Sequence, residues 1–110
     1  MSGTTAGAYV TVARVGEIPP GGVKVLRIGD QEIAVFNVAG AYHAMDDICT
    51  HDGGPLAEGE IEGDVVICPR HGARFSIRTG AALSFPAVTP VDRYPVRVEG
   101  DDLLVGIPEE

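Results

Sequence analysis

The sequence lacks any apolar run that approaches the roughly 20 residues needed for a membrane-spanning helix. Its first seven residues contain neither a basic residue nor an apolar stretch, so they do not resemble a secretory signal peptide. We therefore expect a protein that does not contact the membrane and that stays in the cytoplasm, where thiols remain reduced.

Basic residues are also scarce. Eight Lys and Arg stand against 16 Asp and Glu, for a formal net charge of −8. This excess of negative charge argues against nucleic acid or an anionic membrane surface as a partner, and it suits docking against a basic face of another protein. Ordinary solubility explains the same charge equally well, so both interpretations stay open.

No helical periodicity, internal repeat or low-complexity segment is present. Short apolar and β-branched runs are instead divided by Gly, Pro and Asp, which is typical of an all-β protein. The pattern predicts strands at 9–15, 23–28, 32–38, 41–45, 64–68, 95–98 and 103–107, with a short hairpin arm at 75–80. Tight turns are expected at 29–30 and 39–40, and a further turn at 99–102.

With 110 residues, the chain is expected to form one domain with a single modest core. Residues 46–55 are predicted to be loop and residues 60–63 a turn. Strands from both ends of the chain would form an antiparallel sandwich base, and residues about 46–80 a smaller subdomain inserted into it. Residues 1–7 are expected to be disordered.

The two cysteines, the only ones present, belong to a paired pattern that also takes two of the three histidines. Cys49 is followed at the second position by His51, and Cys68 at the third position by His71, with 16 residues between the two halves. Chance placement of both histidines is of the order of one in a thousand, so we favour a metal site. A tetrahedral zinc, a disulfide between the cysteines, and two unrelated buried cysteines are the competing interpretations.

This pairing resembles the signature of the Rieske family, in which Cys-x-His and Cys-x-x-His bind one 2Fe-2S cluster. The resemblance implies that Cys49 and Cys68 hold an inner iron, and that His51 and His71 hold an outer iron near the surface. Neutral imidazoles replace two thiolates, so the cluster is less negative and easier to reduce than an all-Cys cluster.

The resemblance extends to most of the chain and is greatest to the soluble Rieske ferredoxins. It rests further on Leu56, Gly59, 71–75, 79–80, 86–87 and 94–96. It implies a monomeric one-electron carrier with no substrate of its own, which links a flavin-dependent reductase to a terminal oxygenase or a related oxidoreductase. The alternatives are a small Rieske subunit of another oxidoreductase, such as a nitrite-reductase-like component, and a structural zinc module that binds a partner protein.

Several residues around the ligands are candidates for supporting the cluster. Gly53, Gly54 and Gly72 would let backbone N–H groups approach sulfide closely, or they would simply serve turn geometry. Leu56 resembles an apolar shield of the cluster and Pro86 a proline loop that caps it, although both also suit an ordinary core or turn position.

Departures from the respiratory Rieske proteins indicate a lower reduction potential. Those proteins carry a disulfide-forming cysteine in each ligand loop, where this chain has Gly54 and Arg70. They also carry hydroxyl donors, a serine and a tyrosine, where this chain has Ala73 and Phe75. Without these donors the reduced cluster is less stabilised, so we expect a potential in the lower part of the family range. Ser76 also departs from the Asp common in soluble relatives, with no evident effect.

The remaining polar residues near the pattern carry less weight. His43 falls on a predicted strand away from both ligand loops, and we interpret it as a strand residue rather than a ligand. Charged residues flank both loops and form either a docking rim or ordinary solvated loop faces. They are Asp46, Asp47 and Asp52 beside the first loop, and Arg70, Arg74 and Arg78 beside the second.

Overall fold

The computed structural model of the chain describes residues 6–48, 54–69, 72–85 and 89–108, which form ten β-strands and no helix. The strands are β1 (Ala6–Arg14), β2 (Val23–Ile28), β3 (Gln31–Val38), β4 (Ala41–Asp46), β5 (Glu60–Glu62), β6 (Val65–Ile67), β7 (Arg74–Ser76), β8 (Arg93–Tyr94), β9 (Val96–Glu99) and β10 (Asp102–Pro108). Because these parts of the chain are entirely strand and loop, none of them contains a helix able to cross a membrane.

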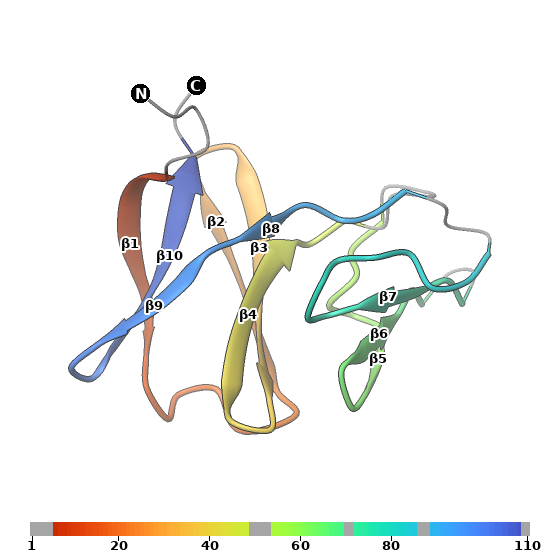
Figure 1. Cartoon of the computed structure of the whole chain (residues 1–110), viewed down its shortest axis with the longest axis horizontal. Helices are drawn as coiled ribbons and strands as arrows, with labels where there is room; N and C mark the ends of the chain where they lie inside the picture. The colour runs from red at the N-terminus through yellow and green to blue at the C-terminus, as the bar shows by residue number, and fades with distance from the viewer. Residues whose placement is uncertain (1–5, 49–53, 70–71, 86–88, 109–110) are drawn as a thin grey trace.

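Three antiparallel sheets divide the molecule into a base and a subdomain (Figure 1). The base contains a sheet of order β1-β10-β9 and a second of order β2-β3-β4-β8, so strands from both ends of the chain meet in it. The small sheet β5-β6-β7 lies to one side, between β4 and β8 in the sequence. The predicted all-β class, with a sandwich base and an inserted subdomain, is confirmed.

Strand β3 separates two apolar cores because successive side chains of a strand point to opposite faces. Ile33 and Val35 pack with Leu103 and Val105 in the core between the two base sheets. Ala34, Phe36 and Val38 face the other way, into a core shared with the subdomain. The subdomain therefore has no separate core, because it packs against one face of the β2-β3-β4-β8 sheet.

The two predicted hairpin turns of the base are confirmed. β2 and β3 pair up to Ile28 and Gln31 across Gly29-Asp30, and β3 and β4 pair up to Val38 and Ala41 across Ala39-Gly40. Ala39 and Gly40 both have positive φ, at 51° and 93°, as a two-residue turn between right-twisted strands requires.

Four details of the predicted elements are wrong. Residues 60–62, predicted as a turn, form β5 instead. The side chain of Ile61 packs against the shared core, while Glu60 and Glu62 are exposed. The turn lies at Gly63–Asp64. β7 ends at Ser76 instead of extending to 80, since Gly80 N donates to Ser76 O at 2.7 Å and closes a turn over residues 76–80. The short β8 was not predicted. β1 begins at Ala6, within the segment expected to be disordered.

Candidate cluster site

The structure describes about half of the predicted site residues. Gly54, Leu56, Cys68, Gly72, Ala73 and Phe75 are among them. Cys49, His51, Gly53, His71 and Pro86 lie outside the described residues, as do the flanking Asp52 and Arg70. The geometry of the site is therefore built from Cys68 and from the segments that lead into and out of both ligand loops.

Cys68 follows β6 directly and is 1% exposed. Its N–H donates to Ala73 O at 2.7 Å, and its own carbonyl accepts from Gly72 N at 3.0 Å, so the β6–β7 hairpin closes tightly over residues 68–73. Gly72 has a φ of +75°, which an L side chain rarely adopts. The turn geometry alone therefore favours glycine at position 72. Lack of space does not, because an added Cβ would contact nothing within 4 Å.

The residues beside Cys68 form a dry apolar environment. Leu56, Ala73 and Phe75 are each 0% exposed and belong to the same buried cluster as Cys68. Leu56 therefore lies where an apolar shield was predicted, although its packing is also that of an ordinary core residue.

Gly59 brings the end of the first ligand loop against the strand that leads to Cys68. A Cβ at Gly59 would lie 1.7 Å from Ile67 O and 3.1 Å from Pro69 Cδ, so no larger residue fits there. Gly59 N also donates to Leu56 O at 2.9 Å, which fixes the turn. A hollow of about 340 Å³ beside this contact is lined by Glu58, Gly59, Cys68, Pro69 and Gly72, among others. Cys68 thus lies close to the surface while remaining almost wholly covered.

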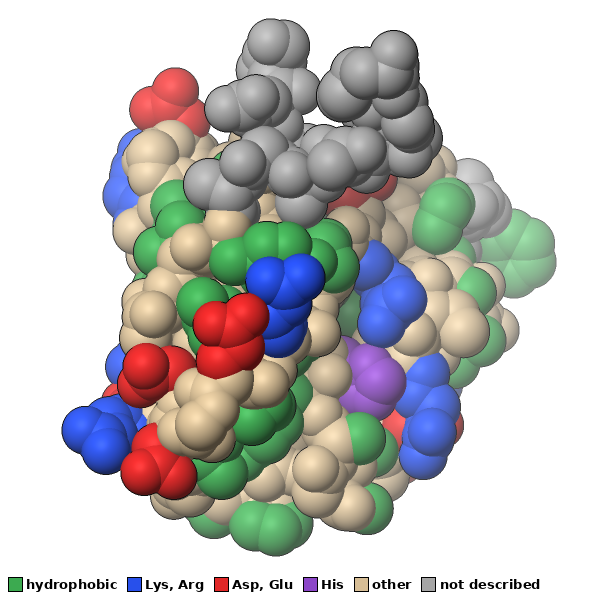
Figure 2. Space-filling model, turned by 60° about the vertical axis from the view of Figure 1, so that its left-hand side comes forward, with side chains coloured by type: hydrophobic (Ala, Val, Ile, Leu, Met, Phe, Trp, Pro, Cys, Tyr) green, Lys and Arg blue, Asp and Glu red, His purple; other side chains and the backbone are tan. Residues whose placement is uncertain are grey.

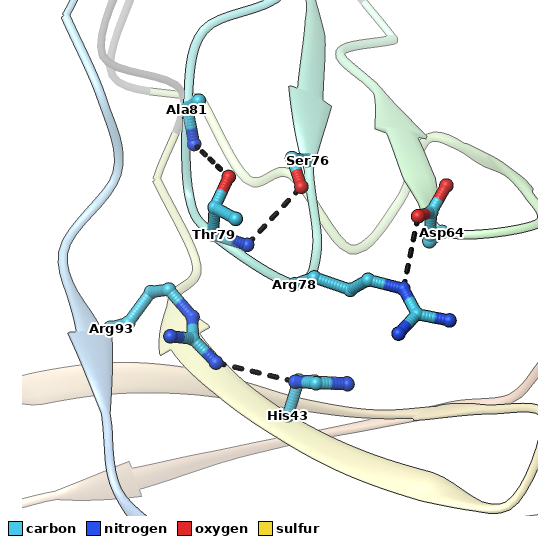
Figure 3. A network of polar contacts seen from close by, with 7 residues as sticks. All are labelled: His43, Asp64, Ser76, Arg78, Thr79, Ala81 and Arg93. Carbon is cyan, nitrogen blue, oxygen red and sulfur yellow. Dashed lines mark hydrogen bonds and ion pairs between the residues drawn. The ribbon is translucent and has the colours of Figure 1, made fainter.

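His43 is on a strand, as the sequence predicted. It lies on β4, and Arg93 of β8 donates to its Nδ1, with 3.2 Å between Nη2 and Nδ1 (Figure 3). The proton of the neutral ring is then on Nε2, which is buried and has no hydrogen-bond partner among the described residues. Burial, together with the charges of Arg93 and Arg78, lowers the pKa of His43.

Four of the six charged residues that flank the ligand loops, Asp46, Asp47, Arg74 and Arg78, lie in the described part of the chain, and they have different surroundings. Arg74 pairs with Glu62 at 3.3 Å and Arg78 with Asp64 at 3.0 Å, both on the exposed surface of the subdomain. Asp47 is instead 5% exposed, and its Oδ1 accepts from Ala57 N at 2.7 Å. Figure 2 shows acidic and basic side chains interspersed on one face, with apolar side chains between them.

Asp46 points into the base. Tyr94 of β8 donates a short hydrogen bond to Asp46 Oδ1 and lies 3.1 Å from Gln31 Oε1. Burial raises the pKa of Asp46, and the hydrogen bond from Tyr94 acts in the opposite direction. Sequence reasoning missed these partnerships because they join residues more than 40 positions apart.

Comparison with known proteins agrees with this geometry. A family model described as the Rieske [2Fe-2S] domain matches residues 8–95. The 3-phenylpropionate/cinnamic acid dioxygenase ferredoxin subunits of Shigella flexneri serotype 5b (strain 8401) and of Escherichia coli (strain K12) are each 42% identical to this chain. In both cases the match spans 97 residues, which is 86% of this chain and 90% of the relative.

Solved structures of ferredoxins have the same fold. The ferredoxin of carbazole 1,9a-dioxygenase from Nocardioides aromaticivorans IC177 superposes with a TM-score of 0.85 at 31% identity, covering 90% of this chain and 97% of that one. The ferredoxin of Sphingomonas yanoikuyae B1 gives a TM-score of 0.86 at 31% identity, covering 92% of this chain and all of the other. The chain belongs to the Rieske [2Fe-2S] domain family and carries one cluster of that type.

Proposed function

We propose that this chain is a Rieske ferredoxin that carries one electron at a time from a flavin-dependent reductase to a terminal oxygenase. The observation that supports this most strongly is the 42% identity, over 90% of their length, to ferredoxin subunits of a dioxygenase. A structure described as a complex of reduced oxygenase and oxidised ferredoxin in carbazole 1,9a-dioxygenase also matches, with a TM-score of 0.87 at 31% identity over 93% of this chain. We further propose that the protein acts as a monomer in the cytoplasm.

The proposed ligands are Cys49 and Cys68 for one iron, and His51 and His71 for the other. The backbone bonds between Cys68 and residues 72–73 support this assignment, because they hold Cys68 at the end of β6, buried beside a surface hollow. When bound, the cluster supplies reversible one-electron chemistry. The role of the protein is then to hold the cluster, to tune its potential through nearby donors, and to present it to partners.

Exposed apolar side chains near Cys68 support docking at this end of the subdomain. Leu83 N donates to Arg74 O at 2.7 Å and Cys68 N donates to Ala73 O, so the segments that contain Leu83 and Cys68 are both bonded to residues 73–74. Leu83 is 51% exposed, and Phe85, two residues later, is 83% exposed. We propose that these two side chains contact the oxygenase, because large apolar side chains left exposed close together in the sequence mark an interaction surface.

Analysis of the metal content tests the assignment. Protein purified without oxidation is expected to contain about two iron and two sulfide per chain, and its reduced form to give the anisotropic electron paramagnetic resonance spectrum of mixed Cys and His ligation. Cys68→Ala and His71→Ala should each lose the cluster, whereas His43→Ala should leave the spectrum unchanged. One zinc per chain after anaerobic reconstitution with iron and sulfide would contradict the proposal and favour a structural zinc module.

A further inference from the structure

Asp47 is a charged residue in a place where charges are rare. It is 5% exposed, and Asn37 is the only other buried polar side chain in the described part of the chain. A carboxylate removed from water is costly unless hydrogen bonds replace its hydration. The position of Asp47, directly after β4 and directly before the first ligand loop, therefore calls for an explanation.

The main chain of Asp47 is held by the base. Its N–H donates to Glu32 O at 2.9 Å, one residue beyond the last β3–β4 pair, Ile33 with Asp46. Asp46 N in turn donates to Asp92 O at 2.9 Å. The start of the first ligand loop is therefore fixed to the sheet by backbone bonds on both sides.

The side chain of Asp47 reaches the other end of the same loop. Its Oδ1 accepts from Ala57 N at 2.7 Å, which is a short distance for an N–H donor to a carboxylate. Ala57 follows Leu56, which is 0% exposed in the cluster that contains Cys68. Gly59 N donates to Leu56 O at 2.9 Å in the turn that includes Ala57, and Gly59 lies directly against Ile67, where a Cβ would not fit. One carboxylate thus joins the base sheet to the cluster subdomain.

We propose that Asp47 is a positioning residue that ties Ala57, next to Leu56 of the cluster that contains Cys68, to the end of β4, and so fixes the two described ends of the segment that carries the proposed ligands Cys49 and His51. This inference rests on the proposed ligand assignment. Residues 48–56 lie between Asp47 and Ala57 in the sequence and include half of the proposed ligands, so the bond sets the separation of the two ends of that segment. This positioning role requires a hydrogen-bond acceptor oxygen on the side chain of residue 47, and it does not require a negative charge there.

Three substitutions separate the acceptor from the charge. Asp47→Asn keeps an oxygen at the same position without charge, Asp47→Glu keeps the charge but moves the oxygens by one methylene, and Asp47→Ala removes both. Asp30→Ala is the matched control, because Asp30 is exposed on the β2–β3 turn. Iron release from holoprotein to a chelator is measured by the loss of visible absorbance, and exchange of the Ala57 amide by hydrogen-exchange mass spectrometry.

We expect Asp47→Ala and Asp47→Glu to release iron about tenfold faster than wild type or more, and to lose protection of the Ala57 amide. Asp47→Asn and Asp30→Ala should remain within about threefold of wild type. If Asp47→Ala does not fold, the contrast between Asn and Glu decides alone. Glu behaving as wild type while Asn fails would overturn the proposal in favour of a charge effect, and equal rates in all variants would also overturn it.

The same experiment distinguishes this inference from the ligand assignment. If wild-type protein binds zinc and no cluster, the proposed function fails, yet protection of the Ala57 amide still reports on loop closure. If wild type holds the cluster and Asp47→Ala retains both iron and amide protection, only the positioning role of Asp47 is wrong.

Discussion

Arg93 of β8 donates to Nδ1 of His43 on β4, across the junction where the turn after β7 meets the base (Figure 3). Arg78 and Asp64 of the subdomain also act on the imidazole, and the charge of Arg78 opposes its protonation. Gly80 lies against the same arginine, since a Cβ there would be 3.1 Å from Arg93 Cγ and 2.4 Å from Val91 O. His43 therefore belongs to the contact between the two parts of the molecule.

Acid should weaken this contact. The folded pKa of His43 is lowered, so the unfolded chain takes up a proton first as the pH falls through about 6.5. The stability present above this pH is therefore lost as the pH falls toward the folded pKa. Urea unfolding midpoints between about pH 5 and 8 should depend less on pH in His43→Gln than in wild type, because glutamine still accepts from Arg93 and does not titrate. Identical pH profiles would contradict this assignment.

The potential should be low and should rise when hydroxyl donors are added. Ala73 and Phe75 are fully buried beside Cys68, so a hydroxyl at either position cannot bond to bulk water and must donate inside the subdomain. About 1.4 kcal/mol of preferential stabilisation of the reduced state corresponds to about 59 mV. We expect a wild-type potential below about 0 mV and an increase of tens of millivolts for each of Ala73→Ser and Phe75→Tyr.

Protein-film voltammetry checks this prediction across pH on wild type and both variants. The potential should be nearly constant around neutrality and fall only in alkali, because imidazoles bound to a less electron-withdrawing cluster remain protonated longer. A wild-type value near about +300 mV, at the top of the family range, or variants that shift downward, would indicate that backbone donors and solvent access set the potential instead.

Gly59→Ala should be strongly destabilising. A Cβ at 1.7 Å from Ile67 O cannot be accommodated without moving the backbone next to Cys68. We expect a loss of about 2 kcal/mol or more in the free energy of unfolding, with partial loss of the cluster. Gly63→Ala is the control: its φ is +61° and nothing lies within 4 Å, so it should cost only the backbone term of about 1–2 kcal/mol and retain the cluster. Thermal unfolding and iron analysis separate the two.

Phe85→Ser should slow electron transfer to the oxygenase without changing the potential. A phenyl ring that is 83% exposed in the isolated chain loses water contact only when a partner covers it. Full burial of such a ring contributes about 1.5–3 kcal/mol, so the second-order rate constant should fall about tenfold. Val98→Ser, also exposed but on β9 of the base, is the matched control. Equal rates for the two variants would place the docking surface elsewhere.

The negative charge of the chain leads to a separate expectation for the same reaction. If the partner presents a basic face, the rate should decline as salt rises from about 20 to 300 mM, because the screening length falls below about 10 Å. Six ion pairs between exposed side chains in the described parts of the chain already balance some of the charge, for example Arg97 with Glu99 at 3.1 Å. A flat salt profile would show that the net charge of −8 serves solubility alone.

The sequence predicted the all-β base because apolar runs such as residues 33–38 of β3, bounded by turn residues, indicate strands that are buried on both faces. It did not predict β5 or β8, which have three and two residues, because such short segments become strands only through pairing with Val65–Ile67 and with Ala44 and Met45. The ligand pattern was readable because Cys and His are rare. Asp47 was not recognised, because an Asp in a loop is normally exposed and nothing local indicates that Ala57 is its partner.

The bond from Asp46 N to Asp92 O brings the entrance and exit of the inserted segment together at one point of the base. Residues 47–91 therefore form a unit that can be exchanged between relatives through two adjacent junctions, in the manner of a domain graft. The transplanted segment would have to match the apolar face made by Phe36, Val38 and Met45. A chimaera joined at these two positions would change the residues around the cluster while leaving both sheets of the base intact.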